Sequence, residues 1–325
     1  MTQHLALGTH QSIRPYLPDD EAAVVRVWNA ALCADPIGVA TWRAKVLLDP
    51  NFDPAGCLVA EAEGRVRGFI LSLVRRVPFF NDGYQPEQAW ITAFGVAPEW
   101  QGRGLGTALL DAALDRLRRL DRKTVALAPY VPNYFTPGAD AHAYAPGVAW
   151  LERRGFQVVE RPLSMRAELT GFQIPESIRQ AEERLAAEGI AIRLATPPDI
   201  VPLLDFIPRH FGWDWHREAS GVLMDLFAGD PRQVSMLVAV RDGAILGYAE
   251  HRAERFGPFG VDPALRSRGI GRVLLAHTLR EMLKKNYHAA WFLWTGDDAA
   301  RLYAQCGFHE VRRFAVLRKS LEDRG

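Results

Sequence analysis

The sequence predicts an α/β protein made of two tandem copies of one mixed-sheet domain. Its 325 residues suffice for two domains of ordinary size. Two segments align without a gap 165 residues apart, FGVAPEWQGRGLGTALL from Phe94 and FGVDPALRSRGIGRVLL from Phe259 (259 − 94 = 165). Around both segments, apolar runs with strand and helix periodicity alternate along the chain. Together these observations favour a duplicated fold over one large domain.

Shorter matches at both ends of each copy extend the repeat. The start of each copy carries Ile-Arg followed by a Pro-Asp turn, and the end carries Gly-Phe: Ile13-Arg14 with Asp20, Ile192-Arg193 with Asp199, Gly155-Phe156 and Gly307-Phe308. We therefore expect one domain over 1–172 and a second over 191–325. The polar segment 173–190 between them reads as a linker helix.

The sequence of each copy predicts the same order of strands and helices. An opening strand precedes a helix, expected over 20–34 in the first copy and from 198 to about 211 in the second. Two strands then meet at a turn, near Gly64 and at Asp242-Gly243, which is a strong hairpin signal. A strand ending at the FGV segment leads into a glycine-rich loop. A helix, a short buried strand and a last helix follow.

Composition excludes several classes of function. The 39 basic and 38 acidic residues leave a net charge of +1, so no global field attracts nucleic acid or an anionic membrane. The scattered Cys33, Cys57 and Cys306 match neither a disulfide framework nor a zinc pattern. Residues 1–12 lack the pattern of a signal peptide. We expect a cytoplasmic protein that uses no metal and does not enter a membrane.

The glycine-rich loops, QGRGLG at 101–106 and RSRGIG at 266–271, predict sites for phosphate groups. Glycines let the backbone turn sharply, and the helix that follows offers free N–H groups and the positive end of its dipole. The alternative is a tight strand-to-helix turn without a ligand, which two matching loops make less attractive. Neither loop has a third glycine at the dinucleotide-binding spacing, and neither has the Gly-Lys-Ser/Thr of a P-loop.

The pattern V-x-P-x-x-Q/R-x-x-G-x-G resembles the acetyl-CoA signature of the GNAT superfamily of N-acetyltransferases. The resemblance covers about 13–170 and 191–320. It implies a splayed mixed sheet, with pantetheine between the two central strands and a bulge near Val96 and Val261 that directs an N–H at the thioester carbonyl. The residues it implies for acetyl-CoA binding are Val96, Gln101, Gly102, Arg103, Gly104, Leu105 and Gly106 in the first copy, and Phe259, Val261, Arg266, Ser267, Arg268, Gly269, Ile270 and Gly271 in the second.

The resemblance also implies that the second copy is the catalytic one. Family members commonly place a Tyr four residues before the Gly-Phe glycine, where it protonates the departing thiolate. That position is Tyr303 in the second copy (307 − 4 = 303) and Leu151 in the first (155 − 4 = 151). A packing role for Tyr303 is the alternative. An Asn that often lies seven residues before this Tyr is replaced by Gly296, which puts one cofactor contact in doubt.

Glu250, His251 and Glu254 are the candidates for a general base, with a solvated edge position as the alternative for each. Loss of the proton through water to bulk solvent is a further option. The acceptor is expected to be a primary amine of a small molecule. Amino sugars and mycothiol-type acceptors are two options, and a non-catalytic acetyl-CoA-binding role for one copy is another. The insertion PYVPNYFTPGADAHAYAP and the segment HFGWDWH (210–216) are expected either to shape an acceptor pocket or to pack between domains.

Overall fold

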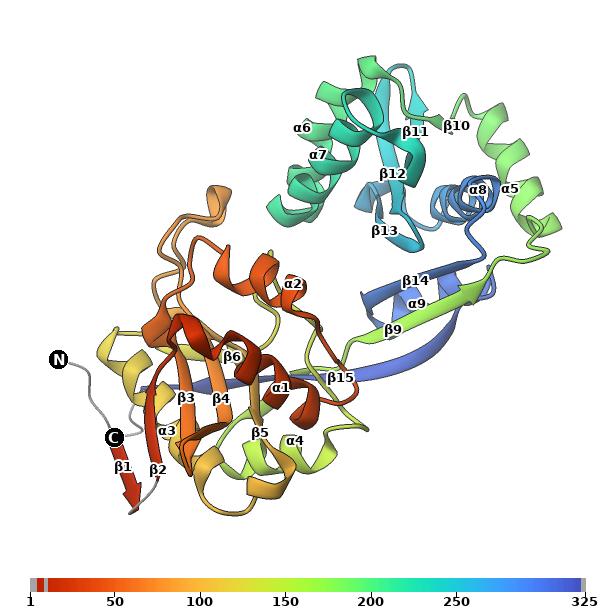
Figure 1. Ribbon diagram of the computed structural model, residues 1–325. Helices are drawn as coiled ribbons and strands as arrows, with labels where there is room; N and C mark the ends of the chain where they lie inside the picture. The colour runs from red at the N-terminus through yellow and green to blue at the C-terminus, as the bar shows by residue number, and fades with distance from the viewer. Residues whose placement is uncertain (1–4, 9–10, 323–325) are drawn as a thin grey trace. The chain divides into compact units, whose positions relative to one another are not determined.

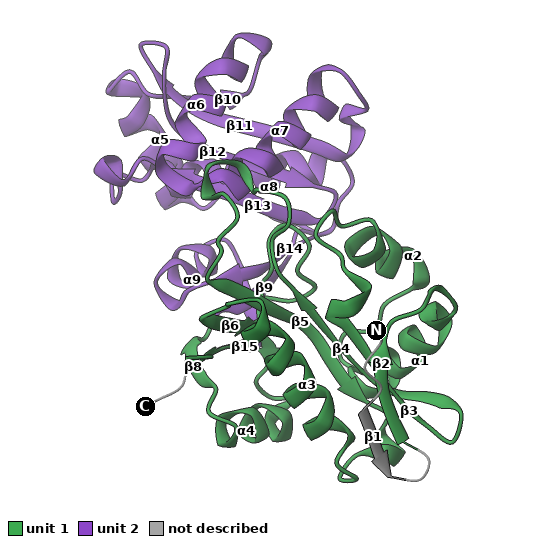
Figure 2. Ribbon diagram, turned by 90° about the vertical axis from the view of Figure 1, so that its left-hand side faces the viewer, with its two compact units in different colours: residues 1–161, 314–325 green, residues 162–313 purple. Residues whose placement is uncertain are grey.

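The computed structural model describes residues 5–8 and 11–322, so part of the amino-terminal segment judged not to be a signal peptide lies outside the described residues. The chain forms two compact units (Figure 1, Figure 2). Unit 1 comprises residues 1–161 and 314–325, and unit 2 comprises residues 162–313. Each unit is a mixed sheet with helices on both faces, which confirms the predicted duplication.

In unit 1, the sheet runs in the order β1–β2–β3–β4–β5–β6–β15–β8, with β5 and β6 parallel. Its helices divide between the two faces of the sheet: α3 and α4 share a core with Leu58 and Ala60, whereas α1 and α2 share one with Cys57 and Val59. The elements of unit 1 are β1 (Leu5–Gly8), β2 (Gln11–Pro15), α1 (Glu21–Ala31), α2 (Val39–Trp42), β3 (Cys57–Ala62), β4 (Arg65–Leu73), β5 (Gln88–Val96), α3 (Leu105–Arg119), β6 (Thr124–Leu127), β7 (Ala139–Asp140), α4 (Ala145–Arg153) and β8 (Gln157–Glu160).

Unit 2 repeats this plan, in the order β15–β9–β14–β13–β12–β11–β10. Helices α5, α8 and α9 share one core with the sheet, and α6 and α7 share the other. The elements are β9 (Leu163–Glu168), α5 (Glu176–Ala187), β10 (Ala191–Leu194), α6 (Ile200–Phe211), α7 (Trp213–Phe227), β11 (Val234–Arg241), β12 (Ala244–Arg252), β13 (Arg255–Val261), α8 (Ile270–Lys284), β14 (Ala289–Thr295), α9 (Asp297–Ala304) and β15 (His309–Ser320), whose last residues belong to unit 1.

The same ion pair opens both copies and explains the repeated Ile-Arg and Pro-Asp motifs. Arg14 bonds to Asp20 at 2.6 Å, and Arg193 bonds to Asp199 at the same distance. Each aspartate also accepts a backbone N–H three residues earlier, at 2.7 Å. The bond from Arg193 lowers the pKa of Asp199 to about 2. The pair therefore ties the first strand of each copy to the start of its first helix.

The two copies exchange their last strands. Strand β9 lies between β14 and the first half of β15 in unit 2, whereas the second half of β15 pairs with β6 and β8 in unit 1. The exchange is symmetrical, because Leu163 and Ala315 each lie eight residues after the matching glycine (163 − 155 = 8; 315 − 307 = 8).

This exchange changes the domain boundaries expected from the sequence. Residues 162–172 belong to unit 2 and residues 314–325 belong to unit 1, because strand pairing crosses between the copies. The expected linker helix is α5. It is not a free linker, since Ile178, Ala181 and Leu185 are buried against α8 in the core of unit 2. A helix with an apolar stripe is expected to bury it in this way.

We expect Leu317→Ala to lower the free energy of unfolding by about 2–5 kcal/mol, because it removes buried methyl groups from the end of β15, which pairs with β6 in unit 1. Leu317 is fully buried, whereas Val311 on the same strand is 47% exposed. Val311→Ala is the matched control and should change the value by no more than about 0.5 kcal/mol. Urea unfolding of the full chain measures both; equal effects would contradict a structural role for the exchanged strand.

Candidate active site

The glycine-rich loop of unit 1 leads directly into helix α3. Gly102 and Gly104 adopt positive φ angles of 74° and 88°, which favour glycine. The first helical hydrogen bond runs from the Ala108 N–H to the Gly104 carbonyl, so the three preceding N–H groups lie before the helical hydrogen-bond series. Such a loop presents backbone donors and a helix dipole to a phosphate group.

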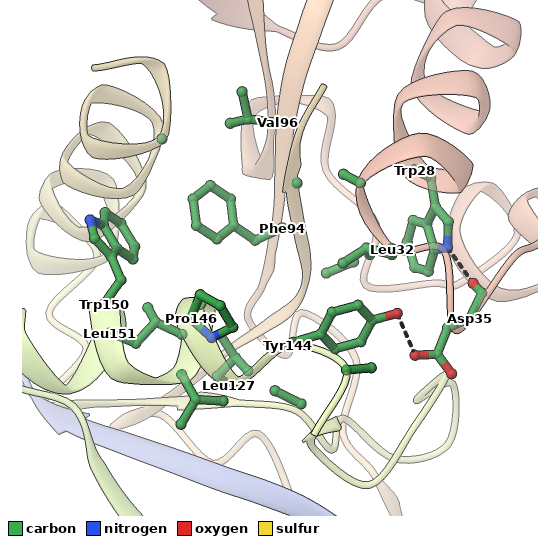
Figure 3. Close-up of a pocket in the computed structure, with 18 of the residues that line it drawn as sticks. Trp28, Leu32, Asp35, Phe94, Val96, Leu127, Tyr144, Pro146, Trp150 and Leu151 are labelled. Atoms are coloured by element: carbon green, nitrogen blue, oxygen red, sulfur yellow. Dashed lines mark hydrogen bonds between the residues drawn. The ribbon is translucent and has the colours of Figure 1, made fainter. Parts of the chain in front are cut away.

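Strands β5 and β6 separate beside this loop. Their parallel pairing ends at Ile91 and Leu127. Beyond that point a pocket of about 740 Å³ opens between them, and residues of the loop, β5, β6, α1 and α4 line it (Figure 3). Of the expected cofactor residues in this copy, Val96, Gln101, Gly102, Gly104 and Gly106 line the pocket. Arg103, also expected there, is not among the lining residues and lies over the Trp100 ring at 4.8 Å.

Backbone groups of β5 face this opening. The Ala97 N–H bonds to the Arg67 carbonyl on the side of β4. Because hydrogen-bonding groups alternate along a strand, the N–H groups of Phe94 and Val96 are directed toward the side of β6. Both residues line the pocket. These donors are therefore placed to bond a linear ligand that lies along β5.

The expected bulge is present in both copies, but not near Val96 and Val261. In β5 the extra residue is Thr92, because Ile91 and Ala93 pair with consecutive residues of β4. In β13 the irregularity falls at Gly257–Pro258. The bulge thus begins four residues before the expected position (96 − 92 = 4; 261 − 257 = 4), where β5 begins to leave β6. Thr92 lines the pocket.

The far end of the pocket is formed by α1 and the residues after it. The Tyr144 hydroxyl donates a hydrogen bond of 2.8 Å to the Asp35 carboxylate, and the Trp28 indole N–H donates one of 2.7 Å to the Asp35 backbone carbonyl (Figure 3). Leu32 extends the same wall. Asp35 was missed in the sequence, because nothing in its local pattern links it to a loop that begins at residue 101.

The aromatic insertion of the first copy contributes to the pocket in part. Phe135 and Tyr144 line it. Tyr130 is buried in the core, where its hydroxyl contacts Asn51 and Asp49. Tyr134 lies outside the pocket lining, with the Lys45 ammonium 5.9 Å from its ring. The insertion therefore contributes Phe135 and Tyr144 to the pocket and Tyr130 to the core of unit 1, and its packing between domains stays a prediction.

The loop of unit 2 has the same backbone path but different surroundings. Ser267 adopts the positive φ that Gly102 has in unit 1 (267 − 102 = 165), and Gly269 has a φ of 98°. Arg268, expected to contact the cofactor, forms an ion pair with Glu188 just after α5. A Cβ on Gly269 would lie 3.4 Å from Ala181 of α5. Helix α5 thus approaches the loop where a phosphate group would bind.

Aromatic rings cluster beside β13 and β14. The Tyr303 ring lies 4.5 Å from the Phe292 ring and 5.9 Å from the Phe259 ring, with Phe256 and Phe308 close by. On the other side of β13, the Phe211 ring lies directly over Gly260: a Cβ added there would be 2.4 Å from it. The equivalent Gly95 in unit 1 faces the methyl group of Ala31 instead.

Tyr303 is half-buried among these rings, and its role as a proton donor stays a prediction. Burial among these rings raises the pKa of its hydroxyl, and a hydrogen bond with Thr295 offsets only part of the effect. A raised pKa makes the phenol a weaker acid. This geometry favours the packing alternative for Tyr303.

The structure places Glu250 and His251 on opposite faces of β12. Glu250 is buried on the α7 side, where burial and the nearby Glu218 raise the pKa of its carboxyl group despite Arg255. His251 is buried on the other face, against Tyr287, and its Nδ1 lies 3.0 Å from the Ala253 carbonyl. Only Glu250 thus faces the side on which α6 and α7 lie.

Two further expectations bear on the described residues. Among them, no group of three or more His, Cys, Asp or Glu side chains is arranged to hold a metal ion. Within the same ranges, no helix combines the length and the apolar character needed to cross a membrane.

We expect His251 to make stability depend on pH. Burial lowers its pKa to about 4, against about 6.5 in an unfolded chain. The folded state therefore favours the neutral ring, and this stabilisation is present above pH 6.5 and is lost as the pH falls toward 4. In His251→Leu, the drop in unfolding free energy from pH 7.5 to pH 4.5 should be smaller by about 2–3 kcal/mol. Substitution of the exposed His288 by Leu is the control and should leave the drop unchanged.

Comparison with known proteins agrees with this architecture. The model of the Acetyltransferase (GNAT) family matches residues 26–136 and 200–308. A mycothiol acetyltransferase of Nocardia farcinica is 26% identical over 310 residues, which cover 88% of this chain and 89% of that protein. Another, of Pseudarthrobacter chlorophenolicus, is 35% identical over 156 residues, which cover 46% of this chain and only 44% of that protein.

Among solved structures, the glucosamine N-acetyltransferase region of a fungal multi-domain GH3 β-N-acetylglucosaminidase superposes with a TM-score of 0.78. The match is 18% identical and covers 97% of this chain and 39% of that one, so it bears on the fold alone. The two family matches fall one in each half of the chain, on the repeat that the sequence predicts. The chain belongs to the GNAT family of acetyltransferases, as a tandem member with two copies of the domain.

Proposed function

We propose that unit 1 transfers the acetyl group of acetyl-CoA to the primary amine of a small molecule. The observation that carries the proposal is the single pocket that runs from the glycine-rich loop, along β5, to the Asp35 carboxylate. A phosphate-binding loop at one end and an acidic group at the other match a cofactor and an amine that meet in the middle. Membership of the GNAT family supports acetyl-CoA as the donor.

The residues present fit acetyl-CoA. The pyrophosphate would lie against the N–H groups at the start of α3, and the pantetheine would bond to the backbone of β5. The N–H groups of Phe94 and Val96 face the place where the thioester carbonyl would lie, so they would stabilise the negative oxygen of the tetrahedral intermediate. The amine nitrogen forms the new bond to the carbonyl carbon and the C–S bond breaks. The proton lost by the amine balances the one gained by the CoA thiolate.

This proposal places the chemistry in the first copy, whereas the spacing of Tyr303 in the sequence favours the second copy. In unit 2 the Phe211 ring covers Gly260, and Glu188 already neutralises Arg268. We propose that unit 2 completes the fold of unit 1 through β15 and does not itself turn over substrate. Acetyl-CoA binding at its loop stays a prediction, as does a cytoplasmic location.

The names of the relatives suggest which acceptor to test first. The two relatives described above are both named mycothiol acetyltransferases, and the one from Nocardia farcinica covers most of this chain. We therefore propose a mycothiol-type amine as the first acceptor to test, with amino sugars as the second.

We expect Gly104→Glu to weaken acetyl-CoA binding by at least about tenfold, because a carboxylate would repel the pyrophosphate at the start of α3. Gly64→Glu is the matched control. Gly64 lies in the β3–β4 turn, and like Gly104 it has a positive φ and open space where a Cβ would point. The Gly64→Glu variant therefore reproduces the backbone strain at a position that does not line the pocket. Calorimetric titration of the full chain measures both; equal losses would show that strain alone explains the effect.

We expect turnover to depend on the loop of unit 1 and not on Tyr303. Gly104→Glu should lower kcat/KM for acetyl-CoA by about 100-fold or more, whereas Gly269→Glu and Tyr303→Phe should stay within about twofold. A positioned proton donor is worth about 100- to 10,000-fold. A tenfold or larger loss of kcat in Tyr303→Phe, with turnover retained in Gly104→Glu, would return the chemistry to unit 2.

A further inference from the structure

The pocket of unit 1 passes through the sheet from one face to the other. Ala93 and Phe94 are neighbours on β5, so their side chains point to opposite faces. Ala93 belongs to the core shared with α1 and α2, and Phe94 packs against the core shared with α3 and α4. Both residues line the pocket. A ligand that begins at the glycine-rich loop therefore runs between β5 and β6 and ends on the face that α1 covers.

The walls of the pocket on the α1 face are apolar. Trp28, Ala31 and Leu32 line it there, from the end of α1 and the residue after it. The Trp28 ring stacks on the Phe69 ring, with the centroids 5.5 Å apart. Leu32 is half-buried and points from the α1 side into the pocket (Figure 3). Such walls favour alkyl groups, because burial of one methylene strengthens binding by about fourfold.

Unit 2 has a larger residue at the position of Leu32. The aspartates that open the two copies lie 179 residues apart (199 − 20 = 179), and the same offset relates Leu32 to Phe211 (211 − 32 = 179). A Cβ on Gly260 would lie 2.4 Å from the Phe211 ring. On the equivalent Gly95 it would meet the Ala31 methyl group at 2.9 Å and Leu32 only at 3.9 Å. The smaller side chains of unit 1 therefore leave space where a ring lies in unit 2.

This space lies where the acyl group of a bound donor would extend. The N–H groups of Phe94 and Val96 are placed to bond the thioester carbonyl between the strands. The carbons beyond that carbonyl would then pass Ala93 and reach Leu32 on the α1 face. An acetyl group has one methyl carbon to bury there, whereas a longer alkyl chain would bury more apolar surface against the same walls.

From these observations we infer that unit 1 also transfers acyl groups of three and four carbons, and that Leu32 sets the size of the acyl group it accepts. The inference rests on the proposed function, since it concerns the acyl end of the same pocket. The step is unchanged. The amine nitrogen bonds to the carbonyl carbon, the C–S bond breaks, and an amide and CoA are released. The proton lost by the amine balances the one gained by the thiolate.

The first test measures binding of acetyl-, propionyl- and butyryl-CoA to the full chain by calorimetry, without an acceptor. We expect Kd to fall by about twofold to fourfold with each added methylene, because each is buried against apolar walls. With an amine that the protein acetylates, kcat/KM for butyryl-CoA should be at least about one third of that for acetyl-CoA. A pocket without room for the chain would reject each methylene by about 10- to 200-fold.

Variants assign the size limit to Leu32. Leu32→Phe introduces the residue of unit 2 and should weaken butyryl-CoA binding by about tenfold or more, with acetyl-CoA binding within about threefold. Leu48→Phe is the matched control, because Leu48 is 77% exposed and lies outside the lining; it should keep the natural order of the donors. Leu32→Ala enlarges the same space and should raise the affinity for hexanoyl-CoA relative to acetyl-CoA by about threefold or more.

The outcomes separate this inference from the proposed function. If Gly104→Glu weakens binding of all three donors but butyryl-CoA binds the natural chain no more tightly than acetyl-CoA, the acyl inference is overturned and the site in unit 1 stands. Equal effects of Leu32→Phe and Leu48→Phe also overturn it. If Leu32→Phe binds no donor, Leu32→Ala decides, and an unchanged order of donors in that variant overturns the inference. If Gly104→Glu changes no affinity, the proposed site is wrong and the inference falls with it.

Discussion

The hydrogen bonding between β5 and β6 stops at Ile91 and Leu127, and what unit 1 can bind depends on that point. Two parallel strands that continued in register would leave no room for a ligand. Here the Thr92 bulge turns β5 away, and backbone N–H groups that would have joined the sheet face an open pocket. Unpaired backbone groups at the bottom of a pocket are costly unless a ligand or water bonds to them.

The separated strand still needs a partner, and the other half of the chain supplies it. Strand β6 pairs on its far side with the end of β15, which comes from the second copy. Phe314, Ala315 and Leu317 are fully buried there. The wall of the pocket in unit 1 is therefore built on a strand whose preceding residues belong to unit 2. This arrangement gives the second copy a role that needs no catalysis.

The two copies share one backbone framework but carry different side chains beside the central strands. Both copies keep the glycine-rich loop, the bulge and the separation of the two central strands. Where unit 1 has Ile91, Leu127 and Leu151, unit 2 has the larger rings of Phe256, Phe292 and Tyr303 (offsets of 165, 165 and 152 residues). Aromatic rings bury large apolar areas and fill such a gap efficiently. A tyrosine at a family acid position can thus stabilise a core, and its place in the sequence does not distinguish the two roles.

The sequence by itself determined the family, the duplicated mixed sheet and the two loops, because each rests on local pattern. The positions of Pro98, Gly104 and Gly106 after a strand imply a turn and a helix start whatever surrounds them. The tertiary structure decided which residues meet. Asp35, Tyr144 and Trp28 come together from separate elements, and the exchange of β9 and β15 joins strands across the whole chain. Such contacts depend on packing between distant segments, which the periodicity of a single segment cannot encode.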